Sequence, residues 1–145
     1  MLKVKYWEVA GDSVRLDYVE KLLKEMGLSE VCKVDLKEGT IRVSVRYDPF
    51  YAEKARIRRL IHLVDSDELR EQLNHLLKMM EDASVYTTVV VAEIPGAAWR
   101  LKTHLEMISK RVDDARSRAP GIKAMMKKVD SYIKEYLRVR GKNVE

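Results

Sequence analysis

Few side chains of this sequence combine the residue types and the spacing that catalysis or metal binding requires. The three histidines, His62, His75 and His104, fall in separate predicted helices and lack the His-Glu-x-x-His spacing of a zinc site. Ser131 and Lys134 have the Ser-x-x-Lys spacing of acylases, but the partner motifs Ser-Asp-Asn and Lys-Thr-Gly are absent. We therefore expect partly exposed helical histidines and a serine–lysine spacing that arises by chance.

The remaining polar clusters have simpler explanations than a site. Asp65, Asp67 and Glu68 could attract a hard cation, but they lack the spacing of a calcium loop, and helix capping accounts for them better. The six glycines are scattered and form no phosphate-binding loop, and we find no catalytic triad. The sequence therefore predicts a protein without catalysis, a bound metal or a cofactor.

The composition predicts a compact soluble protein. Hydrophobic residues make up 46% and charged residues 35% of the 145 residues, which excludes disorder and favours a core under a heavily charged surface. No apolar run reaches the length of a membrane helix and no signal-peptide pattern opens the chain, so we expect no membrane partner. The single cysteine, Cys32, excludes an internal disulfide and fits a reducing cytoplasm. Few amide side chains and many Lys, Arg and Glu residues are typical of a thermophile's protein.

The first third of the chain has the pattern strand, helix, strand, turn, strand. The first strand begins near Val4 and is broken at Gly11. The helix that follows is capped by Asp12 or Ser13, because their side chains accept hydrogen bonds from free N–H groups. It ends at Gly27, since glycine tolerates a positive φ angle.

Two alternating segments, 32–36 and 41–47, predict a β-hairpin joined by the turn at residues 37–39. One face of the hairpin is apolar and includes Cys32, which we expect to be a small core residue. The other face is polar. We call it the open sheet face, and its predicted members are Lys33, Asp35, Arg42, Ser44 and Arg46.

The middle of the chain predicts helix followed by strand. Asp48 and Pro49 open a helix, and Asp65 followed by Glu68 is a second capping signal, so either one long bent helix or two successive helices follow. Segment 84–94 is the most strand-like of the chain, and its run of β-branched residues predicts a strand that is buried on both faces.

The predicted order is β-α-β-β-α-β, which is an α+β, ferredoxin-like unit over residues 1–96. Its expected geometry is a four-stranded antiparallel sheet with helices on one face. Residues 97–145 are expected to form a basic extension of two helices that packs on this domain. Pro120 is well placed to begin the second of these helices.

The two C-terminal helices are predicted from apolar residues spaced alternately by three and four, a heptad pattern. The first row is Ala98, Leu101, Leu105, Ile108, Val112 and Ala115, and the second is Ile122, Met125, Val129, Tyr132, Tyr136 and Val139. Such a hairpin can simply pack on the sheet, or it can mediate self-association or docking to another protein. The residues proposed for that interaction, called the predicted seam below, are Leu101, Leu105, Ile108, Val112, Met125 and Val129.

The N-terminal third resembles a known family. Segments 19–24, 27–28, 34–36 and 47–49, with Gly39 and Val43, look like the heavy-metal-associated domain of copper chaperones and metal-transport ATPases. The resemblance covers about residues 3–50 and implies a ferredoxin-like fold with a Cys-x-x-Cys metal loop after the first strand. Here the two cysteine positions fall on Asp12 and Arg15, or on Val14 and Asp17, depending on the register. Neither register offers the thiolates that a soft metal needs, so the resemblance supports the fold and argues against metal binding.

Charge is distributed unevenly along the chain. Residues 1–96 carry a net charge of −2 and residues 97–145 a net charge of +7, which predicts an acidic partner or a solvated helical surface.

Our first hypothesis is a non-catalytic module for self-association or protein binding through the C-terminal helices and the open sheet face. The alternative is a DNA- or RNA-binding protein that contacts phosphates without sequence preference. A small-molecule sensor is a third possibility that the sequence neither supports nor excludes. The phosphate contacts of the alternative would be Lys102, Lys110, Arg111, Arg116, Arg118, Lys123, Lys127 and Lys128.

Overall fold

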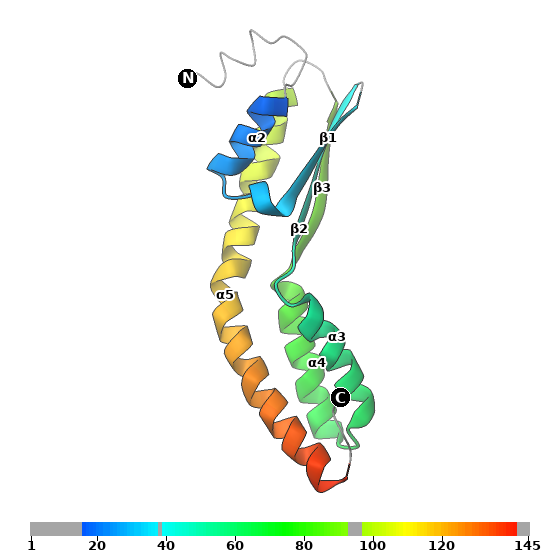
Figure 1. The fold of residues 1–145 in the computed structure, drawn as a ribbon. Coiled ribbons are helices and arrows are strands. Elements are labelled where there is room, and N and C mark those ends of the chain that lie inside the picture. The colour runs from blue at the N-terminus through cyan, green and yellow to red at the C-terminus, as the bar shows by residue number, and fades with distance from the viewer. Residues whose placement is uncertain (1–15, 38, 93–96, 142–145) are drawn as a thin grey trace. The chain divides into compact units, whose positions relative to one another are not determined.

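A computed structural model describes residues 16–37, 39–92 and 97–141 (Figure 1). Within these ranges the chain is α+β, as predicted, with one three-stranded antiparallel sheet, four α-helices and a short 3-10 helix, η1 (Ser29–Val31). The first predicted strand near Val4 and the predicted cap at Asp12 or Ser13 lie outside the described residues.

Helix α2 (Leu16–Glu25) buries Tyr18, Val19, Leu22 and Leu23 along one stripe. It ends as predicted at Gly27, whose φ angle is 71°. The N–H of Leu28 donates to the carbonyl of Leu23 at 2.8 Å, and the N–H of Gly27 donates to the carbonyl of Lys24 at 3.1 Å. This pair of bonds is a Schellman motif, which satisfies carbonyls that the helix end would otherwise leave unpaired.

Strands β1 (Cys32–Lys37) and β2 (Thr40–Tyr47) form the predicted antiparallel hairpin. Lys37 pairs with Thr40, so the connection has two residues, and Gly39 adopts a φ angle of 85° that other residues rarely take. The alternation in the sequence survives as alternating burial, because successive side chains of a strand point to opposite faces.

Strand β3 (Val85–Ala92) pairs with β2 along its whole length, so the described strand order is β1-β2-β3. A ferredoxin-like sheet would place the first predicted strand between β2 and β3. Since both edges of β2 already bond β1 and β3, no strand can lie there, and the described strands depart from the ferredoxin-like order.

The prediction that β3 is buried on both faces is wrong. Val85, Val89 and Val91 are buried, but Tyr86 and Val90 on the other face are 50% and 54% exposed. The run of β-branched residues correctly indicated a strand, because such residues suit extended backbone whether or not both faces are covered.

Two helices, α3 (Tyr51–Leu63) and α4 (Asp67–Asp82), connect β2 to β3, which settles the alternative of one bent helix. The cap of α4 is Ser66 rather than the predicted Asp65. The hydroxyl of Ser66 accepts a hydrogen bond from the N–H of Leu69 at 3.3 Å. At the start of α3, a carboxylate oxygen of Asp48 accepts one from the N–H of Phe50 at 3.2 Å.

The predicted C-terminal helical hairpin is wrong, because residues Ala97–Val139 form one helix, α5, with Pro120 inside it. The buried apolar row continues without a break through Ala115, Ala119, Ile122 and Met126. A proline inside a helix costs about 3 kcal/mol, which is comparable to the gain from burying one or two large apolar side chains. Continued burial on both sides of Pro120 therefore outweighs the break that Pro-Gly suggested.

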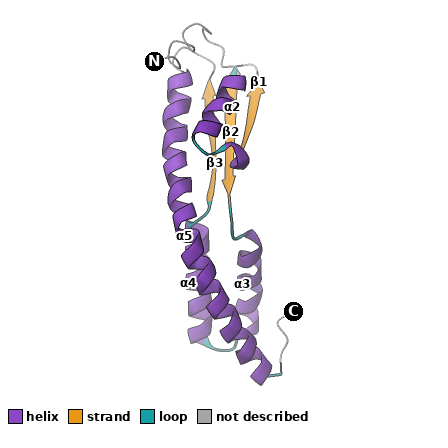
Figure 2. Cartoon of the chain, turned by 60° about the vertical axis from the view of Figure 1, so that its left-hand side comes forward, coloured by secondary structure: helices purple, strands orange, loops and turns teal. Residues whose placement is uncertain are grey.

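The chain divides into two compact units, and each combines segments from before and after residue 96, where the sequence had placed a boundary. The first unit comprises residues 1–47 and 85–113, and the second comprises 48–84 and 114–145. In the first unit, α2 and the first part of α5 lie on the same side of the sheet (Figures 1 and 2). The hydroxyl of Ser109 on α5 donates to the carbonyl of Met26 after α2, at 3.1 Å.

The second unit contains a buried ion pair between Asp48 and Lys54. Lys54 Nζ lies 2.8 Å from Asp48 Oδ2, and the two side chains are only 10% and 3% exposed. Ser84 adds to the cluster, since its hydroxyl oxygen lies 3.4 Å from Lys54 Nζ and 3.3 Å from Asp48 Oδ1. The cluster links the start of α3 to the segment between α4 and β3.

Replacing Lys54 with alanine should destabilise the protein by about 3–5 kcal/mol, because it leaves the Asp48 carboxylate buried without its cation. Urea unfolding followed by circular dichroism measures the change. Arg118→Ala is the matched control, since Arg118 pairs with Asp114 at an exposed site and should cost less than about 1 kcal/mol. Equal losses for the two variants would contradict this role of the buried pair.

Candidate functional site

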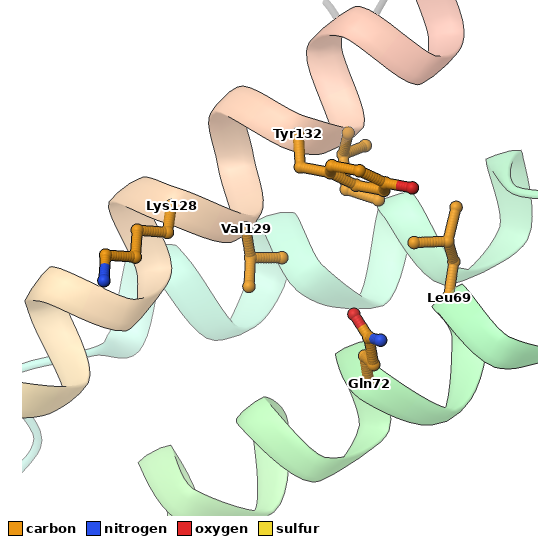
Figure 3. A pocket seen from close by; sticks show the side chains of 6 residues that line it. Leu69, Gln72, Lys128, Val129 and Tyr132 are labelled. Carbon is orange, nitrogen blue, oxygen red and sulfur yellow. The ribbon is translucent and has the colours of Figure 1, made fainter.

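A groove lies between α4 and the second part of α5, both within the second unit. It consists of three adjoining depressions with volumes of about 240, 370 and 520 Å³, and Gln72 borders all three. Figure 3 shows the central one, where Val129 and Tyr132 of α5 point toward α4, and Leu69 and Gln72 of α4 point toward α5.

The two helices that form the groove run antiparallel. Glu68, near the start of α4, borders the same depression as Tyr136 and Arg140, near the end of α5. At the other end, His75 and Leu76 share a depression with Met125 and Val129. We call the α4 side the α4 wall; it comprises Glu68, Leu69, Glu71, Gln72, His75 and Leu76. We call the α5 side the groove row; it comprises Met125, Val129, Tyr132 and Tyr136.

The groove row is a second apolar row beside the one that α5 buries in the core. Ile133 and Leu137 of the core row are 0% exposed, whereas Met125 and Tyr132 of the groove row are 39% and 61% exposed. Spacings of four, three and four residues keep the groove row on one side of the helix. The second unit thus leaves a continuous apolar strip in contact with solvent.

Charges of opposite sign border the groove on its two sides. Glu68 and Glu71 are exposed on the α4 wall, and Lys128 and Arg140 lie on the α5 side. The guanidinium carbon of Arg140 lies 3.8 Å from the centre of the Tyr136 ring, a cation–π contact that holds the charge at the edge of the groove. One side is therefore acidic and the other basic.

The predicted seam is divided by the structure between two roles. Four of its residues are buried in the core and are at most 5% exposed, so they cannot form a surface for a partner: Leu101, Leu105, Ile108 and Val112. Met125 and Val129, by contrast, line the groove.

The α4 wall and the roles of Tyr132 and Tyr136 in the groove were not predicted from the sequence. A signal for the second row was present in the spacing. The alternation of three and four that begins at Ala98 runs unbroken to Ala119, Ile122 and Met126, so the row beginning at Met125 had to be a different one. The α4 wall carries no such signal, since its contact with α5 is tertiary.

The predicted phosphate contacts do not form one surface. Lys110, Arg111, Arg118, Lys123, Lys127 and Lys128 are exposed, and Lys102 and Arg116 are half-buried. They are distributed around α5, since consecutive residues such as Lys127 and Lys128 lie about 100° apart on a helix. The Arg118 guanidinium is also 2.6 Å from the Asp114 carboxylate. The binding of nucleic acid by these residues therefore stays a prediction that no single helix face supports.

The open sheet face lies where the sequence placed it, in the first unit. Lys33, Asp35, Arg42 and Arg46 are exposed and Ser44 is half-buried, with their side chains on the face away from the buried valines.

Metal and membrane features are limited within the described ranges. The three histidines are all exposed, and no group of three or more His, Cys, Asp or Glu side chains in residues 16–37, 39–92 and 97–141 could hold a metal ion. Of the positions that correspond to the cysteines of the heavy-metal-associated domain, only Asp17 is described, and its carboxylate accepts a hydrogen bond from the N–H of Tyr18. No helix in the described part of the chain has the length and apolar character needed to cross a bilayer.

Comparison with known proteins adds no relative: no protein-family model, curated protein or solved structure matches this chain.

The Cys32 thiol is half-buried, and its burial raises the pKa from the usual 9.0 to about 11. The thiol therefore stays protonated at neutral pH, and its thiolate fraction is about 100-fold lower than that of an ordinary cysteine.

We expect Cys32 to react with iodoacetamide at pH 8 about 100-fold more slowly in the folded protein than in urea. Mass spectrometry measures the two rates, and equal rates would contradict the claim that burial lowers the reactivity of Cys32.

Proposed function

We propose that the protein is a non-catalytic self-association module in which the groove of one copy faces the groove of a second copy. The observation that supports this proposal most strongly is the groove row, an exposed apolar strip on α5 that the chain's own core does not use. The proposal keeps the sequence-based hypothesis of association through C-terminal heptad residues. Of the predicted seam it retains only Met125 and Val129, and the other contact residues are now Tyr132 and Tyr136 of the groove row.

The composition of the groove favours a protein partner. Tyrosine and methionine are enriched in the central parts of protein interfaces, and Tyr132 and Met125 are the exposed members of the groove row. Burying a large apolar side chain stabilises an association by roughly 1.5–3 kcal/mol before the costs of binding are subtracted. The antiparallel helix pair also presents residues at helical spacing on both sides, and two such pairs can pack face to face as in a four-helix bundle.

The charges at the edges favour a second copy of this chain as the partner. When two copies meet about a two-fold axis that runs along the groove, each acidic α4 wall faces the basic α5 side of the other copy. The arrangement brings Glu68 of one copy to the level of Arg140 of the other, since both border the same end of the groove. A two-fold interface uses the same patch on both copies, so the patch must be complementary to itself, as this one is.

We expect Tyr132→Glu to abolish the dimer and leave the fold intact, because the substituted side chain is 61% exposed and would place a carboxylate in an apolar contact. The measurement is size-exclusion chromatography with light scattering. The control is Tyr51→Glu on α3, which changes charge equally at a side chain that is 65% exposed and outside the groove. A wild-type-like mass for Tyr132→Glu would exclude the groove as the contact.

A charge swap tests the arrangement of the two copies. We expect Glu68→Lys with Glu71→Lys to weaken self-association, because both edges of the groove become basic, and Lys128→Glu with Arg140→Glu to weaken it because both become acidic. Mixing the two variants should restore the dimer, since each altered edge then meets the opposite charge. Native mass spectrometry distinguishes the mixed dimer from either parent. If the mixture dissociates as readily as each variant alone, α4 does not face α5 of the other copy.

A further inference from the structure

The open sheet face of the first unit also includes Lys37, an exposed side chain at the end of β1, and with it carries four exposed cations in a regular order. The strand register places Lys33 opposite Ser44 and Lys37 opposite Thr40. Measured along β2, the cations therefore follow one another every two residues and alternate between strands: Arg46, Lys33, Arg42 and Lys37. Two residues of a strand span about 7 Å. The result is a staggered ladder of positive charge with a spacing similar to that of phosphates in an extended single strand.

The neighbouring strand, β3, offers a neutral surface with an aromatic ring. Tyr86 lies opposite Arg46 and is 50% exposed, and the Arg46 guanidinium carbon is 5.7 Å from the centre of its ring. Thr88, whose hydroxyl donates to Ser44 at 3.4 Å, and Val90 follow along the same face. An exposed ring beside a row of cations is the combination that single-stranded nucleic acid requires, since bases stack on rings while phosphates contact cations.

A single carboxylate opposes this charge among the described residues of the face. Asp35 lies opposite Arg42, and its Oδ2 is 3.6 Å from Lys37 Nζ. Four cations and one carboxylate give the described residues of the face a charge of +3. An acidic protein surface would be attracted by the same charge, but it would need neither the even spacing nor the ring.

We infer that the open sheet face binds single-stranded nucleic acid, with phosphates along the cation ladder and a base stacked on Tyr86. This site is separate from the groove, lies in the other unit and does not depend on self-association. It also differs from the phosphate contacts predicted on α5. The exposed ring favours a single strand over a duplex, because the base faces of a duplex are stacked on one another and unavailable to Tyr86.

The test is fluorescence anisotropy of a fluorescein-labelled oligothymidylate with the full chain over a salt series. Four phosphate contacts predict a slope of about −3 for log affinity against log salt concentration. Lys33→Gln with Arg42→Gln should halve that slope, and Tyr86→Ala should weaken binding by about 5- to 150-fold. Asp35→Asn should strengthen binding, because it removes the only opposing charge among the described residues of the face.

The matched control is Lys123→Gln with Lys127→Gln, which removes two exposed cations from α5 and should leave the affinity almost unchanged. All substituted side chains are exposed, and thermal melts confirm that each variant is folded. The inference is overturned if the full chain does not bind at low salt. It is also overturned if the α5 variant lowers the affinity and the sheet variants do not. A third result also overturns the inference. If polyglutamate competes as well as unlabelled oligothymidylate and Tyr86→Ala binds like the unmodified chain, the face recognises an acidic protein surface instead.

Discussion

The burial of one side of α5, before and after Pro120, is the constraint on which the rest of the structure depends. Leu101, Leu105 and Val112 serve the core of the first unit, and Ile133 and Leu137 serve that of the second, all at 0% exposure. Each such side chain contributes roughly 1.5–3 kcal/mol, so together they exceed the roughly 3 kcal/mol that Pro120 costs inside the helix. One helix consequently supplies part of both cores, and neither unit is a continuous segment of the chain.

This use of α5 determines which surfaces are available for partners. In the second unit, burial of the core row leaves Met125 and Tyr132 at the edge of the groove with α4, where acidic and basic sides face each other. In the first unit, α2 and α5 lie on one side of the sheet, and the charged face is exposed. We propose that the first of these surfaces, the groove, contacts a copy of the protein and that the second, the open sheet face, contacts a polyanion.

Several local signals in the sequence predicted local structure correctly. Gly27 predicted the end of α2, Gly39 the hairpin turn, and the alternation of β1 and β2 the open sheet face, because each depends on backbone conformation or on side-chain periodicity. The pairing of β3 with β2 is non-local and leaves no trace in the sequence of either strand. Pro120 and Gly121 misled the prediction of a hairpin, since the apolar spacing across them is the stronger determinant. The groove could not be predicted, because it depends on how α4 packs against α5.

Sedimentation velocity of the unmodified chain over a wide concentration range tests the central claim, that the surplus apolar row of α5 is a self-association surface. If the row is such a surface, the mean mass rises reversibly from the 16.9 kDa of one chain toward twice that value as concentration increases. A mass of one chain at every concentration, at low and at physiological salt, would contradict it.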